Sequence, residues 1–352
     1  MCHYFEFAVF LLAAHHLWMQ ILDLPLVICR LHYPTTTNTH SKRPTMTISA
    51  GSIKLTTAEQ AEEFLNKYDD FLFDCDGVLW AGSKLLPHVI ETLDLLRSRG
   101  KRLIFVTNNS TKSRKAYTGK FAKFGIQVSE DEIFCSAYSS AVYLKDVIGF
   151  PKDKKVLIVG EKGIEEELEA AGIQYVGGTD TTLRKVDPTE EDIDALHYDP
   201  SIGAVLCGLD LKITYLKIAN ALLQIQHKET LFLATNIDST FPTHGKLLPG
   251  AGTIVGTLIT SSGRTPVALG KPSEAMMDCI KAKFQFNPER ACMVGDRLNT
   301  DMVFGTKGGL GTLMVLTGVD KEESIQPENN PLVQPKFYAD RLGVLYELLG
   351  DK

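Results

Sequence analysis

Two aspartates one residue apart follow a short apolar run in "FLFDCDGVLW" (71–80). Asp and Gly favour turns, so an ordinary loop would by itself explain the DCDG stretch. Two carboxylates at the end of a buried strand can instead supply a nucleophile and an acid/base group. Asp74 and Asp76 are therefore candidate catalytic residues, and the rest of the chain has to decide between these two interpretations.

Three further segments place polar side chains directly after apolar stretches of strand character. They are "RLIFVTNNS" (102–110), "PVALGKP" (266–272) and "RACMVGDRLNTD" (290–301). The side chains of interest are Thr107, Asn108, Asn109, Lys271, Asp296 and Asp301. Each segment alone is a weak signal, because such turns are common after strands. Since parallel strands bring their carboxyl ends to one edge of a sheet, the four segments together indicate a single site.

These residue types suit the hydrolysis of a phosphate monoester. The phosphate dianion needs a cation, hydrogen-bond donors, a nucleophile and a proton donor for the leaving oxygen. Clustered aspartates raise one another's pKa unless a cation lies between them, and oxygen ligands with open positions suit Mg²⁺. Mg²⁺ and Lys271 would neutralise the phosphate, and Thr107 and backbone N–H groups would donate to it. One aspartate could attack phosphorus while the other protonates the leaving alcohol.

The elements that must position these residues alternate between strand and helix patterns. Helical spacing is expected over 56–68, 89–100, 113–125, 139–149 and 161–172, and the first of these helices begins with a capping box at Thr57 and Gln60. The strands between them are continuous apolar runs, as in "VLIVG", which fits burial on both faces. The sequence therefore predicts an α/β fold whose parallel sheet has helices on both faces.

The domain organisation follows from the same pattern. Further strand–helix units between about 150 and 262 are long enough to form an inserted α/β domain, so the catalytic core is expected at 46–149 and 263–352. In the N-terminal extension (1–45), residues 5–29 are apolar but interrupted by polar residues, and no Lys or Arg precedes the apolar run. Residues 33–45 are expected to be a disordered linker. We expect this extension to be dispensable, with a membrane anchor as the alternative, and we expect the protein in the cytoplasm, with the nucleus left open.

Composition excludes some partners and cofactors. The net charge is −6, and no run rich in Lys and Arg is present, which argues against nucleic acid. The seven cysteines are scattered, odd in number and free of any C-x-x-C spacing, so they are expected to be reduced thiols rather than disulfides or zinc ligands. Cys75 lies between the two aspartates, and strand alternation predicts that it points into the core.

The segments "DCDGV", "VTNNS", "GKP" and "GDRLNTD" resemble the four motifs of the haloacid dehalogenase-like (HAD) phosphatase superfamily. Their sequences are most similar to those of the 4-nitrophenylphosphatase and phosphoglycolate phosphatase group, especially its fungal members. The resemblance runs from about residue 46 to the end. It implies a Rossmann-like core and a large α/β cap of the C2 type inserted between the second and third motifs. That cap corresponds to the insert at 150–262.

The resemblance also implies a role for each site residue. Asp74 would be the nucleophile and Asp76 the acid/base. Mg²⁺ would be held by the Asp74 carboxylate, the Asp76 backbone carbonyl and Asp296. Asp301 would orient a metal-bound water or Lys271, with helix capping as the alternative. The phosphate would be held by Thr107, Asn108, Asn109 and Lys271.

Substrate choice is expected to lie in the cap, because the leaving group meets that domain. The candidate residues are Asn236, Asp238 and Phe241 in "ATNIDSTFPTHGKLLPGAG" (234–252), with an ordinary cap loop as the alternative. A closing cap favours small phosphorylated metabolites such as 2-phosphoglycolate. A phosphoprotein phosphatase and a non-catalytic phosphometabolite sensor are the other hypotheses, and the resemblance favours a homodimer formed through the cap. We interpret Arg297 as an ion-pair partner and Trp80 as packing near the site mouth.

Overall fold

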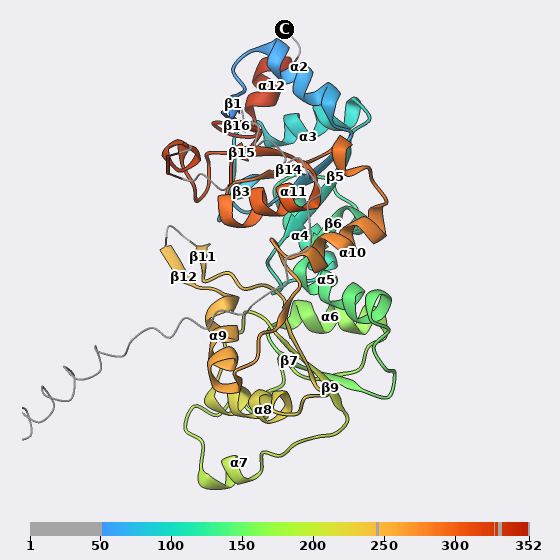
Figure 1. The fold of residues 1–352 in the computed structure, drawn as a ribbon, viewed down its shortest axis with the longest axis vertical. Helices are drawn as coiled ribbons and strands as arrows, with labels where there is room; N and C mark the ends of the chain where they lie inside the picture. Colours follow the sequence, from blue (N-terminus) through green and yellow to red (C-terminus); the bar gives the residue numbers. More distant parts are fainter. Residues whose placement is uncertain (1–50, 244–245, 327, 330–332, 351–352) are drawn as a thin grey trace, which may run out of the picture. The chain divides into compact units, whose positions relative to one another are not determined.

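The structure, a computed structural model, describes residues 51–243, 246–326, 328–329 and 333–350. The expected extension at 1–45 lies outside these residues. Two parallel sheets, each flanked by helices on both faces, form the described chain (Figure 1). This arrangement confirms the predicted α/β class.

The larger sheet has seven parallel strands in the order β1-β16-β15-β14-β2-β5-β6. Their bounds are Ile53–Lys54 (β1), Phe337–Ala339 (β16), Gly311–Val315 (β15), Ala291–Gly295 (β14), Asp70–Phe73 (β2), Arg102–Thr107 (β5) and Ile133–Cys135 (β6). The central strand β2 pairs Leu72 with Met293 on β14 and with Ile104 on β5. The first, second and fourth polar segments therefore leave the carboxyl ends of three adjacent strands.

Alternation along β2 sends its side chains into two separate cores. Phe71 and Phe73 lie in one buried cluster and Leu72 in the other, and all three are fully buried. Helices α2 (Ala58–Lys67), α3 (Val89–Ser98), α4 (Arg114–Lys123) and α12 (Val344–Leu349) contribute to the first cluster, and α10 (Glu274–Phe284) and α11 (Val303–Gly308) to the second. Helix α5 (Ser136–Val142) contributes to both. Burial on both faces explains why the strands are continuous apolar runs.

The second sheet belongs to the insert and has the order β13-β10-β9-β7-β8. Its strands are Val267–Ala268 (β13), Leu231–Ala234 (β10), Ile202–Cys207 (β9), Lys155–Val159 (β7) and Tyr175–Gly177 (β8). The sequence placed "PVALGKP" at a strand end of the catalytic sheet, in a core segment beginning at 263. That placement is wrong for the strand, because β13 pairs with β10 of the insert, Leu233 opposite Val267. Only the segment after β13 enters the core.

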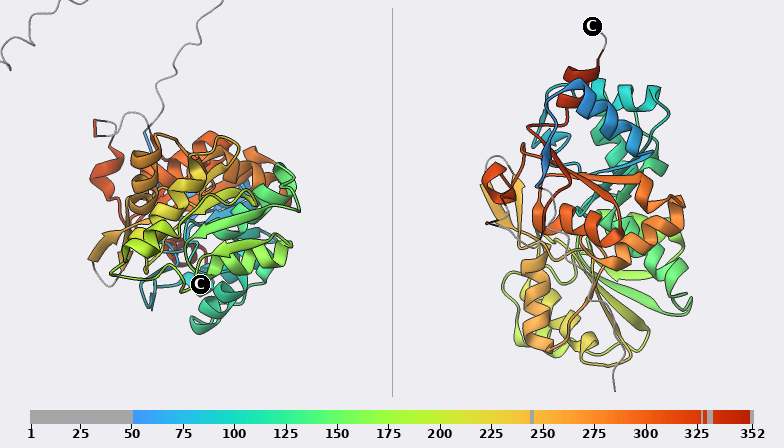
Figure 2. Two further views of the ribbon diagram at one scale, coloured as in Figure 1. Left: turned by 90° about the horizontal axis from the view of Figure 1, so that it is seen from below. Right: turned by 45° about the horizontal axis from the view of Figure 1, so that its top comes forward.

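Helices cover both faces of the second sheet as well. Helices α8 (Tyr215–Ile225) and α9 (Ala251–Ser262) pack on one face, and α6 (Lys162–Ala171) lies on the other, as Figure 2 shows from two further directions. The short helix α7 (Glu190–Asp194) follows β8. The α6 face shares one buried cluster with the core domain, so the two domains are joined by continuous apolar packing. Two antiparallel ribbons complete the fold, β3 (Trp80–Ala81) with β4 (Lys84–Leu85) and β11 (Thr240–Thr243) with β12 (Lys246–Pro249).

The local signals in the sequence are confirmed. Thr57 caps α2, its Oγ1 accepting from the Gln60 N–H at 3.3 Å while Gln60 Oε1 accepts from the Thr57 N–H at 3.1 Å. The helices expected to end at Gly100, Gly125 and Gly172 do so, each glycine having φ between 70° and 76°. The five cysteines within the described ranges, Cys75 among them, are buried free thiols. Among the described residues, no helix has the length and apolarity that crossing a membrane requires.

Candidate active site

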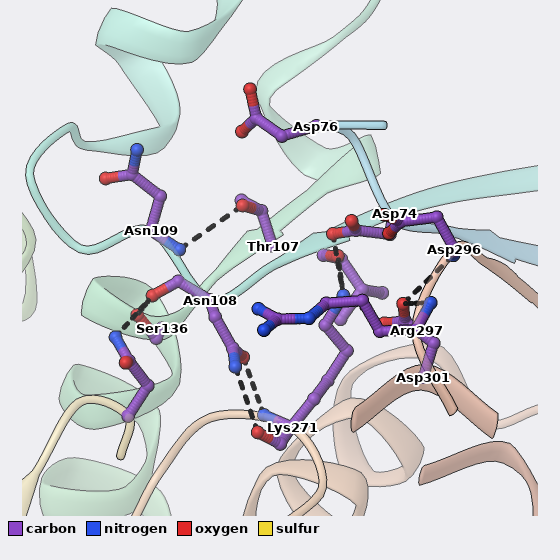
Figure 3. A network of polar contacts seen from close by, with 12 residues as sticks. Asp74, Asp76, Thr107, Asn108, Asn109, Ser136, Lys271, Asp296, Arg297 and Asp301 are labelled. Carbon is purple, nitrogen blue, oxygen red and sulfur yellow. Dashed lines mark hydrogen bonds and ion pairs between the residues drawn. The ribbon is translucent and has the colours of Figure 1, made fainter. Parts of the chain in front are cut away.

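The four polar segments converge on one cleft of about 470 Å³ between the core and the insert. Asp74 follows β2, Thr107 ends β5, Asp296 follows β14, and Lys271 follows β13 of the insert (Figure 3). Every candidate residue named from the sequence lines this cleft, including Asn236, Asp238 and Phe241 of the insert. The four segments therefore meet at one site, as their positions at strand ends predicted, although one of them follows a strand of the other sheet.

A buried lysine connects three of these segments. Lys271 Nζ lies 2.7 Å from Oδ1 of Asp74 and 2.8 Å from Oδ1 of Asp301, and it donates to the Val106 carbonyl at 2.9 Å. Only 2% of the lysine side chain is exposed. Burial alone would lower the pKa of Lys271, but Asp301 and Asp74 outweigh it and raise that pKa. The ammonium is therefore a fixed positive charge at the floor of the cleft.

The positive charge of Lys271 does not fully compensate the buried carboxylates around it. Desolvation raises the pKa of Asp74 to about 7 against the opposing field of Lys271, and it raises the pKa of Asp296 well above its usual range. Asp296 Oδ2 accepts from the Val319 N–H at 2.7 Å, whereas its Oδ1 is buried and has no hydrogen-bond partner among the described residues. Asp74, Asp296 and Asp301 each place an oxygen within 4.8 Å of the others. An oxygen-preferring divalent cation fits this donor set.

Asp301 has a second function besides the contact with Lys271. Its Oδ2 accepts from the backbone N–H groups of Asp296 and Arg297, at 3.2 and 3.1 Å. It thus holds the turn after β14, where a single π-helical turn (Leu298–Met302) begins. Of the two hypotheses from the sequence, orientation of Lys271 matches a contact that this residue makes. Helix capping is wrong, because Asp301 lies inside the π-helical turn and neither that turn nor α11 (Val303–Gly308) has a side-chain cap.

Asp76 is held apart from Asp74 by two residues that the sequence analysis did not assign to it. Trp80 Nε1 donates to Asp76 Oδ1 at 2.7 Å, and Lys120 Nζ lies 3.3 Å from the same oxygen. Figure 3 shows the Asp76 carboxyl group pointing away from Asp74. Trp80 is fully buried, as expected for packing, but it also binds the candidate acid/base. The i, i+4 spacing from Asp76 to Trp80 was the available signal, whereas nothing local marked Lys120 on α4.

The "TNN" segment shapes the loop through its own side chains. Thr107 Oγ1 accepts from the Asn109 N–H at 3.2 Å, and Asn109 Oδ1 accepts from both the N–H and the hydroxyl of Thr111. Asn108 Oδ1 accepts from the Lys271 N–H at 2.7 Å, and its Nδ2 donates to the Lys271 carbonyl at 2.9 Å. Both asparagine side chains are engaged in positioning the backbone. A phosphate would therefore meet this loop through its N–H groups and the Thr107 hydroxyl.

Two residues of the insert contact the core at Asn108. Asn236 Nδ2 donates to the Asn108 carbonyl at 2.8 Å, and Asn108 Nδ2 donates to Asp238 Oδ2 at 3.0 Å. Burial raises the pKa of Asp238, while Asn108 and then Arg297 act in the opposite direction. Asn236 is buried, so its hydrogen bond is shielded from water. The predicted cap residues thus lie at the junction of the two domains as well as in the cleft.

Arg297 differs from its sequence interpretation as an ion-pair partner. Its side chain makes no ion pair or hydrogen bond with any residue that the structure describes, and its Nε is buried without a partner. It lines the cleft instead. The interpretation failed because the sequence showed a charge beside Asp296 but not the direction in which it points.

Comparison with known proteins identifies the family. Residues 71–174 match the haloacid dehalogenase-like hydrolases, and residues 268–345 match a HAD-hydrolase-like family. The chain is 52% identical to a 4-nitrophenylphosphatase of Schizosaccharomyces pombe over 84% of its own length and 98% of the relative's. It is 46% identical to phosphoglycolate phosphatase 1A, chloroplastic, of Arabidopsis thaliana, over 81% of this chain and 78% of that protein.

Solved structures show the same likeness. The p-nitrophenyl phosphatase from Archaeoglobus fulgidus superposes with a TM-score of 0.68 at 29% identity, covering 80% of this chain and 100% of that one. A glycerol phosphate phosphatase from Mycobacterium tuberculosis, solved in complex with magnesium, gives a TM-score of 0.67 at 30% identity, with 80% and 77% covered. These matches span both the sheet that carries Asp74 and the insert.

Proposed function

The chain belongs to the haloacid dehalogenase-like hydrolases, and we propose that it removes phosphate from small phosphate monoesters in a Mg²⁺-dependent reaction. Like its 4-nitrophenylphosphatase and phosphoglycolate phosphatase relatives, it is a phosphoric monoester hydrolase. The observation that carries the proposal is the charge arrangement at Lys271. One ammonium is shared by Asp74 and Asp301, beside an Asp296 oxygen that has no hydrogen-bond partner in the described part of the chain.

In the first proposed step, a carboxylate oxygen of Asp74 attacks phosphorus. The bond between phosphorus and the leaving oxygen breaks, and the electron pair goes to that oxygen. Asp76 donates its carboxyl proton to the leaving oxygen, so an alcohol departs. Lys271, the Thr107 hydroxyl and the N–H groups after β5 stabilise the charge on the phosphoryl oxygens. The product of this step is an aspartyl-phosphate on Asp74.

In the second proposed step, water replaces the aspartate. Asp76, now a carboxylate, accepts a proton from a water molecule as the water oxygen attacks phosphorus. The bond between phosphorus and Asp74 breaks, and its electron pair returns to the carboxylate. Inorganic phosphate leaves with both catalytic residues restored to their starting protonation states. Trp80 Nε1 and Lys120 Nζ keep Asp76 at the cleft through both transfers.

The donor set at the floor of the cleft supports a divalent metal. Asp74 and Asp296 would hold Mg²⁺ with carboxylate oxygens and Asp76 with its backbone carbonyl, while Asp301 stays occupied by Lys271 and two backbone N–H groups. When bound, Mg²⁺ supplies positive charge to the phosphoryl oxygens as they become more negative. The buried Oδ1 of Asp296, which none of the described residues contacts by a hydrogen bond, is the feature that favours this assignment.

The insert favours small substrates. Asn236, Asp238 and Phe241 line the cleft opposite the catalytic aspartates, so a leaving group lies between the two domains. We propose 4-nitrophenyl phosphate as an in vitro substrate and 2-phosphoglycolate-like esters as the metabolite class. A folded phosphoprotein would have to reach Asp74 past the insert, which favours the small-molecule assignment over a phosphoprotein phosphatase.

The test measures phosphate release from 4-nitrophenyl phosphate, 2-phosphoglycolate and a phosphopeptide panel, with and without Mg²⁺. Asp74→Asn is the test variant, and Asp94→Asn, which makes the same charge change at an exposed position on α3, is its control. We expect Mg²⁺-dependent turnover of the small esters that Asp74→Asn reduces at least about 10³-fold and Asp94→Asn leaves intact. Turnover of none of these compounds would support the sensor hypothesis, and faster turnover of phosphopeptides would support the protein phosphatase.

A further inference from the structure

Arg297 is a cation in the cleft that the proposed phosphate chemistry does not use. It follows Asp296 directly, and its backbone N–H donates to Asp301 at 3.1 Å. Its guanidinium group makes no hydrogen bond or ion pair with the described residues. Figure 3 shows the side chain extended away from its own backbone, toward the Asn108 side of the site. A guanidinium group has five N–H donors, and those on the two Nη atoms of Arg297 remain available to a bound ligand.

The other cations of the cleft are either already paired or exposed. Lys271 contacts two carboxylates at its floor, and Lys120 contacts Asp76. Lys112 lines the cleft but is exposed to solvent. Among the described cleft residues, Arg297 is therefore the partly buried cation that has no carboxylate within 4.0 Å to neutralise its charge. A planar guanidinium fork of this kind matches a carboxylate through two parallel hydrogen bonds.

The position of Arg297 relates it to the leaving group rather than to the phosphate. The phosphate end of the cleft has its own donors in Lys271, Thr107 and the N–H groups after β5. Arg297 acts electrostatically on Asp238, a residue of the insert that lines the same cleft. Arg297 and Asp238 both line the space between the core and the insert. The leaving-group atoms beyond the ester oxygen of the substrate have to lie in this space.

Resting on the proposed function, we infer that Arg297 selects substrates whose leaving group carries a carboxylate. The substrate class is then the phosphate esters of hydroxy acids, of which 2-phosphoglycolate is the smallest member. Arg297 would bind the carboxylate while Lys271 and Thr107 hold the phosphate, so the ester is fixed at both ends. Esters of neutral alcohols and phenols would use the same phosphate site without this second contact.

The experiment compares three esters in the presence of Mg²⁺: 2-phosphoglycolate, glycerol 3-phosphate and 4-nitrophenyl phosphate. The variants are Arg297→Met, which removes the guanidinium group, and Arg297→Lys, which keeps the charge but loses the fork. Lys112→Met makes the same charge change at an exposed position of the same cleft. Thermal unfolding midpoints of all three proteins check that each variant is folded.

We expect Arg297→Met to lower kcat/KM for 2-phosphoglycolate about 10- to 100-fold more than for the two esters with neutral leaving groups, mainly through KM. Arg297→Lys should fall between, and Lys112→Met should change all three esters equally. An equal loss on all three esters in Arg297→Met would overturn the inference, because the arginine would then serve the phosphate or the fold. Failure of the unmodified protein to hydrolyse any of the esters would instead contradict the proposed function itself.

Discussion

The indole Nε1 of Trp80 donates a 2.7 Å hydrogen bond to Oδ1 of Asp76, and Lys120 Nζ lies 3.3 Å from that same oxygen. The indole ring is fully buried and stacks on Phe124 with the ring centroids 5.2 Å apart. Lys120 Nζ also lies 4.2 Å from the centroid of the indole. The carboxyl group proposed to protonate the leaving oxygen is therefore held by a donor that packing prevents from rotating.

Trp80→Phe tests this positioning, because it keeps an aromatic ring and removes the donor. Proton donation matters most for a poor leaving group, so kcat for glycerol 3-phosphate should fall about tenfold. For 4-nitrophenyl phosphate, whose phenolate leaves without protonation, kcat should change little. Phe124→Leu is the control, since it disturbs the same ring stack and keeps Nε1. Equal losses on both esters in Trp80→Phe would mean that the residue acts only through packing.

Removal of Lys271 should destabilise the protein as well as inactivate it. Lys271→Met leaves Asp74 and the buried Asp301 without their shared cation, and an uncompensated buried charge costs about 3–5 kcal/mol of unfolding free energy. Urea unfolding of the metal-free protein measures this loss. Lys283→Met removes the exposed ion pair with Asp131 and should cost no more than about 1 kcal/mol.

A second variant separates charge from packing in this prediction. In Lys271→Met/Asp301→Asn one of the two unpaired carboxylates is neutral, so part of the lost stability should return. If the double variant is no more stable than Lys271→Met, the loss comes from the packing of the lysine side chain rather than from its charge.

The sequence predicted the site well because its signals are local. Asp74, Thr107 and Asp296 each follow an apolar run, and such runs identify buried strands without knowledge of their neighbours. Parallel pairing of β14, β2 and β5 then brings the three residues to one edge of the sheet. The capping box of α2 and the helix-terminal glycines were predictable for the same reason, since each depends on residues within one or two turns.

What could not be predicted depends on contacts between distant segments. Strand β13 has only two residues, and no local feature tells which sheet it joins. Lys120 is 44 residues from Asp76 in sequence, so its contact requires the packing of α4. Asn108 stays a predicted phosphate-binding residue, but the sequence did not show that its side chain binds the Lys271 backbone, 163 residues away. A polar side chain in a loop can face a ligand or a neighbouring backbone, and only the tertiary structure decides between them.

Gly318 lies against the candidate metal ligand Asp296, which gives a further prediction. A Cβ at this position would lie 1.7 Å from Oδ2 of Asp296, far inside van der Waals contact. Gly318→Ala should therefore displace the carboxylate and lower the affinity for Mg²⁺ at least about tenfold, as measured by calorimetry. Gly119→Ala, in the middle of α4 with open space around it, should keep Mg²⁺ binding and raise the unfolding free energy by up to about 1 kcal/mol. Unchanged affinity in Gly318→Ala would remove Asp296 from the metal site.

The raised pKa of Asp74 predicts how Mg²⁺ stabilisation depends on pH. In the metal-free protein this pKa is about 7, against 3.8 for an ordinary aspartate, because the cleft desolvates the carboxylate. The folded state therefore prefers protonated Asp74, and its contribution to stability is complete below pH 3.8 and is lost as the pH rises through about 7. Mg²⁺ binds the ionised carboxylate, so it should bind more tightly over the same interval. The rise in unfolding temperature on adding Mg²⁺ should accordingly grow from about pH 4 to about pH 8.

Thermal unfolding with and without Mg²⁺ across this pH range measures the effect. Other groups also titrate in the interval, so the informative quantity is the difference between the unmodified protein and Asp74→Asn. The variant has no carboxylate to ionise at this position, and it should show a smaller Mg²⁺ shift with a weaker pH dependence. A Mg²⁺ shift of the same size at every pH, or an equal pH dependence in Asp74→Asn, would show that Asp74 is not the group whose ionisation admits the metal.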